Sequence, residues 1–174
     1  MTDEQIFHLI LIAGFAIIIP AGMYHRVKSQ ASGERLDRRQ EGLFVLATLR
    51  PLGIAGWLGL IAYMINPASM AWSAVSLPAW VRWPGVGVCA VGSSLLIWTM
   101  HTLGKNLTDT VVTRKDHTLV TGGPYRFVRH PFYCAFILAV LANSTVPANW
   151  FILLTGVSAW LVMVFRTNLR KKRT

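Results

Sequence analysis

The sequence predicts an all-α, multi-pass membrane protein with about five transmembrane helices, and three observations support this fold class. Of the 174 residues, 53% are hydrophobic and only 14% are charged, which is typical of membrane proteins. Five apolar stretches follow one another along the chain. Basic residues are concentrated in alternate connecting segments. The length suits a single membrane domain over residues 1–174.

The apolar stretches differ in length. A helix needs about 20 apolar residues to cross the hydrocarbon core, with a usual range of about 17–25. The first three are long enough, whereas the last two are short and are separated only by the turn at 143–149. We therefore expect the last two to form a short helical hairpin. In chain order the stretches are residues 6–27, 43–65, 86–103, 132–146 and 150–165.

The distribution of basic residues predicts the orientation. The segments 26–39, 105–129 and 166–173 hold most of the Lys and Arg residues, and Arg82 is the basic residue expected on the opposite side. The positive-inside rule then places the N-terminus outside and the C-terminus in the cytosol. The first stretch follows MTDEQ, which has no basic region, so we expect a retained span. The net charge of +10 is thereby assigned to contacts with the lipid bilayer, not to nucleic acid.

The domain divides into three parts. Residues 1–103 form an N-terminal part of three spans, 104–166 a loop followed by the hairpin, and 167–174 a short basic tail. Between the second and third spans, the tryptophans predict an interfacial segment on the outer headgroups. Glycines at three-residue spacing in the second span would let another helix approach closely. These residues are Trp72, Trp80 and Trp83, and Gly53, Gly56 and Gly59.

Cysteines and histidines in the spans give little sign of a metal site. Cys89 and Cys134 both fall within spans and are interpreted as small apolar residues, so no metal site is predicted. His25 and His101 lie near the cytosolic ends of two spans. Axial ligation of a haem by these two histidines is kept as a minor alternative.

The segment HTLVTGGPYRFVRHPFYCA, residues 117–135, concentrates polar and basic groups at the start of the fourth span. Glycine permits positive φ and a close approach of ligand to backbone, and arginine pairs with carboxylate or phosphate. His130 precedes Pro131, which is favoured at the first position of a helix, where backbone N–H groups lack partners. From the residues alone, a binding site for a polar ligand and a basic anchor for the fourth span both remain open.

The part HTLVTGGPYRFVRHPFY resembles the signature of the integral-membrane methyltransferases, which include isoprenylcysteine carboxyl methyltransferase and the phospholipid N-methyltransferases. The upstream TLGKNLTDTVV also resembles prokaryotic members, which together with the size favours a prokaryotic plasma (inner) membrane. The resemblance covers about residues 95–166. The positions that carry it are His117, Leu119, Val120, Gly123, Tyr125, Arg129, His130, Pro131 and Tyr133.

The resemblance implies methyl transfer from S-adenosylmethionine, bound in a cytosolic pocket, to a small or lipid-linked acceptor that enters between helices. The acceptor could be a thioether-bearing carboxylate, a phospholipid amine or a small thiol. Arg129 and His130 would be the catalytic residues, with Arg129 pairing with the carboxylate of the cofactor or of an acidic acceptor. The expected cofactor-binding residues are His117, Leu119, Val120, Gly123, Tyr125, His130 and Tyr133.

The sequence departs from the family's pattern near its end. Members carry an arginine followed by a pair of glutamates after the last hairpin helix, and Arg166 matches that arginine. Leu169, Arg170 and Lys171 stand where the glutamates are expected, and no acidic residue follows Asp116. The cofactor is positively charged at its sulfonium and ammonium groups, so carboxylates would favour its binding. The alternative is therefore a catalytically impaired or truncated member that acts as a non-enzymatic membrane binding protein.

Overall fold

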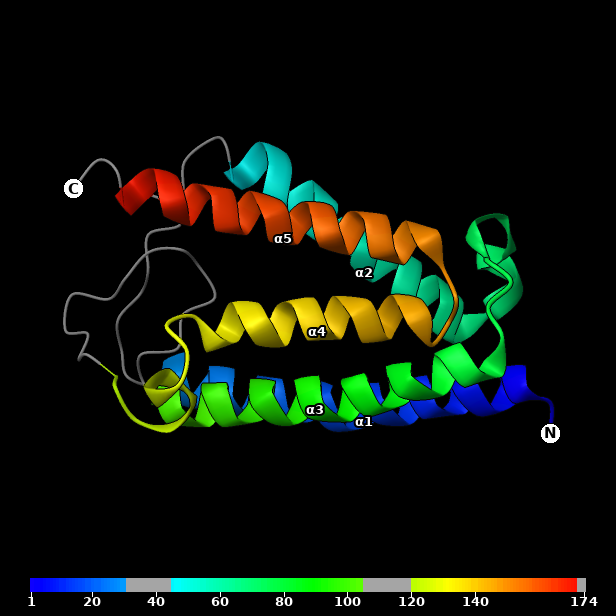
Figure 1. Ribbon diagram of the computed structural model, residues 1–174, viewed down its shortest axis with the longest axis horizontal. Coiled ribbons are helices and arrows are strands. Elements are labelled where there is room, and N and C mark those ends of the chain that lie inside the picture. The colour runs from blue at the N-terminus through cyan, green and yellow to red at the C-terminus, as the bar shows by residue number, and fades with distance from the viewer. Residues whose placement is uncertain (31–44, 105–119, 172–174) are drawn as a thin grey trace.

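The computed structural model of the protein describes residues 1–30, 45–104 and 120–171. Helices make up most of this part of the chain, and no named strand occurs in it, which confirms the all-α fold class (Figure 1). Short helical turns cover Val45–Leu49, Pro67–Ser73 (η3) and Gly123–Arg126 (η5). The α-helices are α1 (Asp3–Gln30), α2 (Arg50–Ile65), α3 (Ala79–Leu103), α4 (Pro131–Thr145) and α5 (Trp150–Lys171).

Three helical segments are long and apolar enough to cross a membrane, namely Asp3–Ser29, Ala47–Ile65 and Ala79–Leu103. Two apolar helices are shorter, namely Pro131–Thr145 and Trp150–Arg166. The expected division into three long and two short apolar helices is thus confirmed. The protein is an integral membrane protein.

The helices form a bundle with α4 at its centre. Helix α4 packs against both α3 and α5, α1 packs on α3, and α2 packs on α5 (Figure 1). Glycines on α3 and α5 allow both helices to pack closely on α4. A Cβ on Gly92 of α3 would lie 3.0 Å from Leu138, and one on Gly156 of α5 would lie 2.7 Å from Val140. Of the glycines expected to line a helix contact in α2, Gly56 faces Thr155 and Gly59 faces Phe151.

The third α-helix begins seven residues earlier than predicted. It starts at Ala79 instead of residue 86, so Trp80 and Trp83 lie on the helix itself and not in the segment that precedes it. Pro84 lies inside this helix, where it removes one backbone hydrogen bond without ending the helix. Both tryptophans remain exposed, as does Trp72 in η3.

The turn between α4 and α5 is fixed by a buried asparagine. The side-chain carbonyl of Asn149 accepts hydrogen bonds from the backbone N–H groups of Phe151 and Ile152, at 3.1 and 3.2 Å, and so caps α5. Its amide nitrogen donates to Ser73 Oγ at 2.8 Å, which ties the turn to η3. A cluster of buried apolar side chains fills this end of the bundle, formed by Phe7, Leu11, Leu60, Tyr63, Met70, Val146 and Ile152.

Candidate functional site

The predicted site residues that the structure describes gather between the end of α3 and the start of α4. His117 and Leu119 lie outside the described residues. Val120 begins the described segment, which continues through η5 to the first turn of α4. Gly123, Tyr125, Arg129, His130 and Tyr133 follow within 14 residues of Val120, so one short segment carries them all.

Position 123 needs a glycine for two reasons, the conformation of the backbone there and the close approach of α3. Its φ is +57°, a left-handed conformation that residues with a side chain rarely adopt. A Cβ there would lie 2.5 Å from Thr102 Oγ1, on the last turn of α3. The glycine therefore lets η5 pack directly on α3, and it fixes where the segment turns towards α4.

Tyr125 is half-buried within η5, and its backbone N–H donates to the carbonyl of Gly122 at 3.2 Å. Burial raises the pKa of its phenol above the usual value of 10.0. The hydroxyl consequently keeps its proton at neutral pH. In contrast, Arg126 and Arg129 are exposed on either side of the next turn, so both guanidinium groups reach solvent or headgroups.

His130 and Tyr133 form a stacked pair on the first turn of α4. Their ring centroids are 5.1 Å apart with an interplanar angle of 16°. His130 is the N-cap residue, and its carbonyl accepts from the backbone N–H of Tyr133 at 3.0 Å. From α5, Trp160 Nε1 donates to the carbonyl of Tyr133 at 3.2 Å. The pair is thus held at a helix N-terminus, where backbone N–H groups and the helix dipole favour negative charge.

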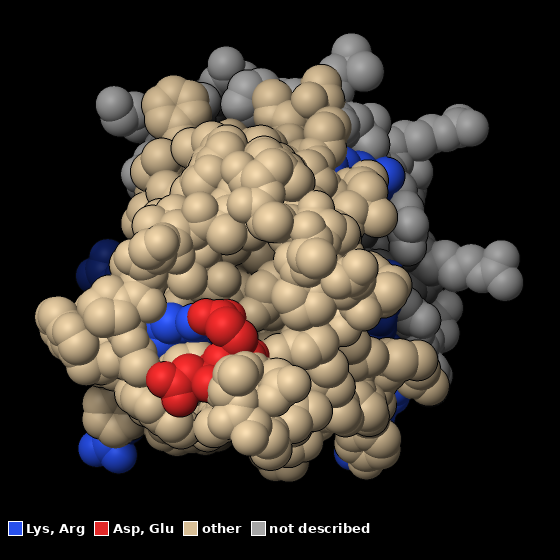
Figure 2. Space-filling view, turned by 90° about the vertical axis from the view of Figure 1, so that its right-hand side faces the viewer, with Lys and Arg blue, Asp and Glu red and all other residues tan. Residues whose placement is uncertain are grey.

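Charge is distributed unevenly between the two ends of the bundle. Among the residues that the structure describes, Asp3 and Glu4 are the only acidic ones. Both lie at the end that carries the N-terminus (Figure 2), and Glu4 is paired there with the buried Arg82. The described part of the site instead presents Arg126 and Arg129, and one guanidinium nitrogen of Arg166 is buried on α5. This end of the described structure therefore favours anionic groups.

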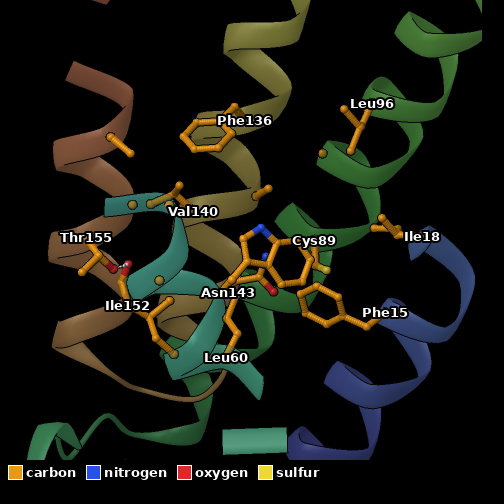
Figure 3. A pocket seen from close by; sticks show the side chains of 18 of the residues that line it. Phe15, Ile18, Leu60, Cys89, Leu96, Phe136, Val140, Asn143, Ile152 and Thr155 are labelled. Atoms are coloured by element: carbon orange, nitrogen blue, oxygen red, sulfur yellow. Dashed lines mark hydrogen bonds between the residues drawn. The ribbon is translucent and has the colours of Figure 1, made fainter. Parts of the chain in front are cut away.

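A cavity of about 230 Å³ lies inside the bundle, and all five α-helices contribute to its lining. The lining is mainly apolar, with Phe15 from α1, Leu60 from α2 and Leu96 from α3 among its residues (Figure 3). Phe136, which also lines it, comes one helical turn after Tyr133. The lining of the cavity therefore reaches to within one helical turn of Tyr133 along α4.

The structure also brings together the two histidines that the sequence offered as axial ligands in the minor haem alternative. The rings of His25 on α1 and His101 on α3 lie edge to face, with centroids 5.9 Å apart. Both stand near the helix ends that lead into the connecting segments, and that position was the signal available in the sequence. No group of three or more His, Cys, Asp or Glu side chains able to hold a metal ion occurs among the described residues. Cys89 and Cys134 are both free thiols.

Residues 85–172 match the sequence profile of the isoprenylcysteine carboxyl methyltransferase (ICMT) family. The match covers half of the chain and runs from α3 through η5, α4 and α5, so it contains the stacked pair and the loop before it. No curated protein matches the chain.

Proposed function

The chain belongs to the isoprenylcysteine carboxyl methyltransferase family, and we propose that it transfers the methyl group of S-adenosylmethionine to a lipophilic acceptor at the cytosolic face of a membrane. Membership of the family implies methyltransferase activity in general. The cofactor, the acceptor class and the roles of individual residues form the finer proposal. It is supported by the geometry at the start of α4.

The described residues fit the chemical groups of S-adenosylmethionine. The stacked rings of His130 and Tyr133 offer an aromatic surface for adenine. The N-terminus of α4 and the exposed guanidinium of Arg129 suit the carboxylate of the amino-acid part. Bound there, the cofactor supplies a methyl group on a sulfonium, which is a strong electrophile. Charge is dispersed during such a transfer, so the protein's task is to align the two reactants and exclude water.

One observation carries the choice of a lipophilic acceptor, namely that the mainly apolar lining of the cavity includes Phe136, one turn after Tyr133 on α4. An acceptor with its reactive group beside His130 could place an apolar chain among the side chains of Phe136 and Leu96. Trp57, which is half exposed, borders the cavity on α2 and faces Phe15 of α1, with ring centroids 5.7 Å apart. An acceptor that enters from the lipid between α1 and α2 would have to pass these two rings.

A second function is favoured by the charge at the site. The described residues around the stacked pair include no carboxylate, and Arg170 and Lys171 occupy positions where the family carries glutamates. A site with this charge would bind a cationic cofactor less tightly. The runner-up function is therefore a non-enzymatic membrane protein that binds ligand without methyl transfer.

Calorimetric titration of the detergent-purified protein with S-adenosylmethionine and S-adenosylhomocysteine tests the proposal. We expect saturable binding that His130→Ala weakens by about tenfold or more, because the variant removes half of an aromatic stack. Phe127→Ala is the matched control, since Phe127 is an aromatic residue of the same loop, 75% exposed. It should bind as the wild type does.

Absence of binding at millimolar ligand would refute the proposal. Binding that is followed by methylation of a single-chain acceptor would support the enzyme. Binding without turnover on carboxylate, amine and thiol acceptors would support the non-enzymatic function instead.

A further inference from the structure

The loop between η5 and α4 presents apolar side chains to the outside of the bundle, next to an arginine. Arg126, Phe127 and Val128 follow one another and are all exposed, and we call these three residues the loop tip. Phe127 is 75% exposed. Exposed apolar side chains on the spans face lipid chains, whereas Phe127 lies outside the helices and beside a charged group, so its surroundings need an explanation of their own.

The backbone on both sides of the loop tip fixes the outward direction of Phe127. Pro124 is fully buried, and its carbonyl accepts hydrogen bonds from the N–H groups of Phe127 and Val128, each at 3.1 Å. Gly123 packs on Thr102, and α4 begins three residues after the loop tip. Phe127 cannot turn inwards without breaking these contacts, so an apolar partner for its ring has to come from outside the described structure.

The loop tip lies at the end of a membrane-spanning helix. Thr102, the residue against which Gly123 packs, belongs to the last turn of α3, which is long and apolar enough to cross a membrane (Figure 1). The ends of such a helix lie where the acyl chains give way to the headgroups. At that level an aromatic ring can enter among acyl chains while a neighbouring basic side chain reaches the headgroups. This position makes lipid the partner that suits both side chains.

The charge around the loop tip favours anionic headgroups. Arg126 forms no ion pair with any described residue. The end of α1 lies beside the same turn of α3, since His25 contacts His101, and it adds the exposed Arg26 and Lys28. The acidic residues of the described structure lie at the opposite end of the bundle (Figure 2). A guanidinium binds phosphate bidentately, and a basic residue near an anionic membrane surface gains about fivefold in affinity.

We propose that the loop tip is a binding site for an anionic phospholipid. The guanidinium of Arg126 binds the phosphate and its negatively charged surroundings, and the ring of Phe127 lies among the acyl chains. The site goes beyond the proposed function, because it requires neither the cofactor nor a methyl acceptor. Arg129, on the other side of the turn, stays available to the cofactor. Lipid bound in this way would hold the segment that leads to His130 at the membrane surface.

The test measures the midpoint of thermal unfolding of the full chain in mild detergent, without cofactor, against the concentration of three probes. The probes are dihexanoylphosphatidylglycerol, dihexanoylphosphatidylcholine and inorganic phosphate. We expect the anionic lipid to raise the midpoint saturably, because a ligand that binds the folded state stabilises it. The zwitterionic lipid should need about fivefold more for half the effect, and phosphate alone should give no shift, since it has no chain for Phe127 to contact.

Variants of the loop tip separate its two contacts. Arg126→Gln should bind the two lipids alike, because the preference comes from the charge of Arg126. Phe127→Ala should need about tenfold more of either lipid and keep the preference, because it loses only the burial of a ring. Phe127→Trp should bind as the wild type does, since tryptophan is also favoured at the interface. Both side chains are exposed, so these variants should fold.

Matched controls come from exposed residues of the same types elsewhere. Arg50→Gln changes an exposed arginine at the start of α2, and Phe165→Ala changes a phenylalanine on α5 that is 58% exposed. Both should respond to the lipids as the wild type does. Losses in the controls as large as those at the loop tip would overturn the proposal. Equal affinity of the wild type for the two lipids, or an equal shift with inorganic phosphate, would also overturn it.

Calorimetric titration of the same variants with S-adenosylmethionine keeps the two proposals apart. A saturable, charge-dependent lipid response in a protein that does not bind the cofactor would refute the proposed function and support the lipid site. Cofactor binding in a protein whose midpoint shows no preference for the anionic lipid would refute the lipid site alone.

Discussion

Arg82 of α3 is paired with Glu4 of α1 across 78 positions of sequence, and the two side chains differ greatly in exposure. The guanidinium of Arg82 is 4% exposed, whereas the carboxylate of Glu4 is 71% exposed. Arg82 also donates from Nε to the carbonyl of Val146 at 2.8 Å and lies over the ring of Phe7, 4.2 Å from its centroid. One arginine thereby connects α1, α3 and the turn before α5.

This asymmetry predicts unequal effects of removing the two partners. Arg82→Ala should lower the free energy of unfolding by about 2–4 kcal/mol, because it removes a charged hydrogen bond and a cation–π contact. Glu4→Gln should cost about 1 kcal/mol or less, because water can replace an exposed carboxylate. Chemical denaturation in detergent measures both changes, and a larger loss for Glu4→Gln would contradict the description of Arg82 as the connecting residue.

Tyr133 is expected to act through its ring. Tyr133→Phe keeps the stack on His130, so its affinity for S-adenosylhomocysteine should stay within about threefold of the wild type, whereas Tyr133→Ala should lose about three- to tenfold more. Calorimetric titration compares them. If Tyr133→Phe is as weak as Tyr133→Ala, the hydroxyl and not the aromatic face contributes the affinity.

Gly123 is expected to tolerate no side chain. Gly123→Ala should destabilise the protein by about 1–2 kcal/mol from the left-handed backbone alone, with a further cost from the contact with Thr102. Thermal unfolding should show this loss, and addition of Thr102→Ala should recover only the part due to the contact. The matched control is Gly122→Ala, where φ is −87° and nothing lies within 4 Å. A similar loss at Gly122 would mean that the loop responds to any added side chain.

Tyr125 should make the stability of the folded protein depend on pH in the alkaline range. Burial raises the pKa of its phenol, so the folded protein holds this proton more tightly than the unfolded chain. Its contribution to stability is therefore complete below the unfolded value of about 10 and is lost as the pH rises through the higher folded pKa. The absorbance of tyrosinate, taken as the difference between the wild type and Tyr125→Phe, should titrate above pH 10. A midpoint below 10 would contradict the burial of this ring.

Much of the fold could be predicted because each apolar helix is specified by residues that follow one another in the sequence. The length of each apolar stretch relative to the bilayer identifies three long helices and two short ones, and all five appear at the expected places. The start of α3 was misplaced because the apolar stretch begins only at residue 86, whereas the helix itself begins at Ala79 and includes part of the tryptophan-containing segment.

The proximity of two predicted site residues follows from equally local information. His130 and Tyr133 are three residues apart at the start of a helix, so their stacking follows from helical geometry once Pro131 marks the helix start. The contact of Gly123 with Thr102, by contrast, joins residues from opposite sides of the long connecting segment, and it depends on how η5 returns to α3.

The sequence by itself determined the membrane class, the order of long and short apolar helices and the composition of the loop that carries the candidate site. Only the tertiary structure decided which distant residues meet. Three features depend on which helix lies beside which: the pairing of Arg82 with Glu4, the contact of His25 with His101, and the apolar cavity inside the bundle. Apolar periodicity defines one helix at a time, whereas neighbours are selected by the packing of small residues such as Gly92 and Gly156 against bulky side chains on another helix.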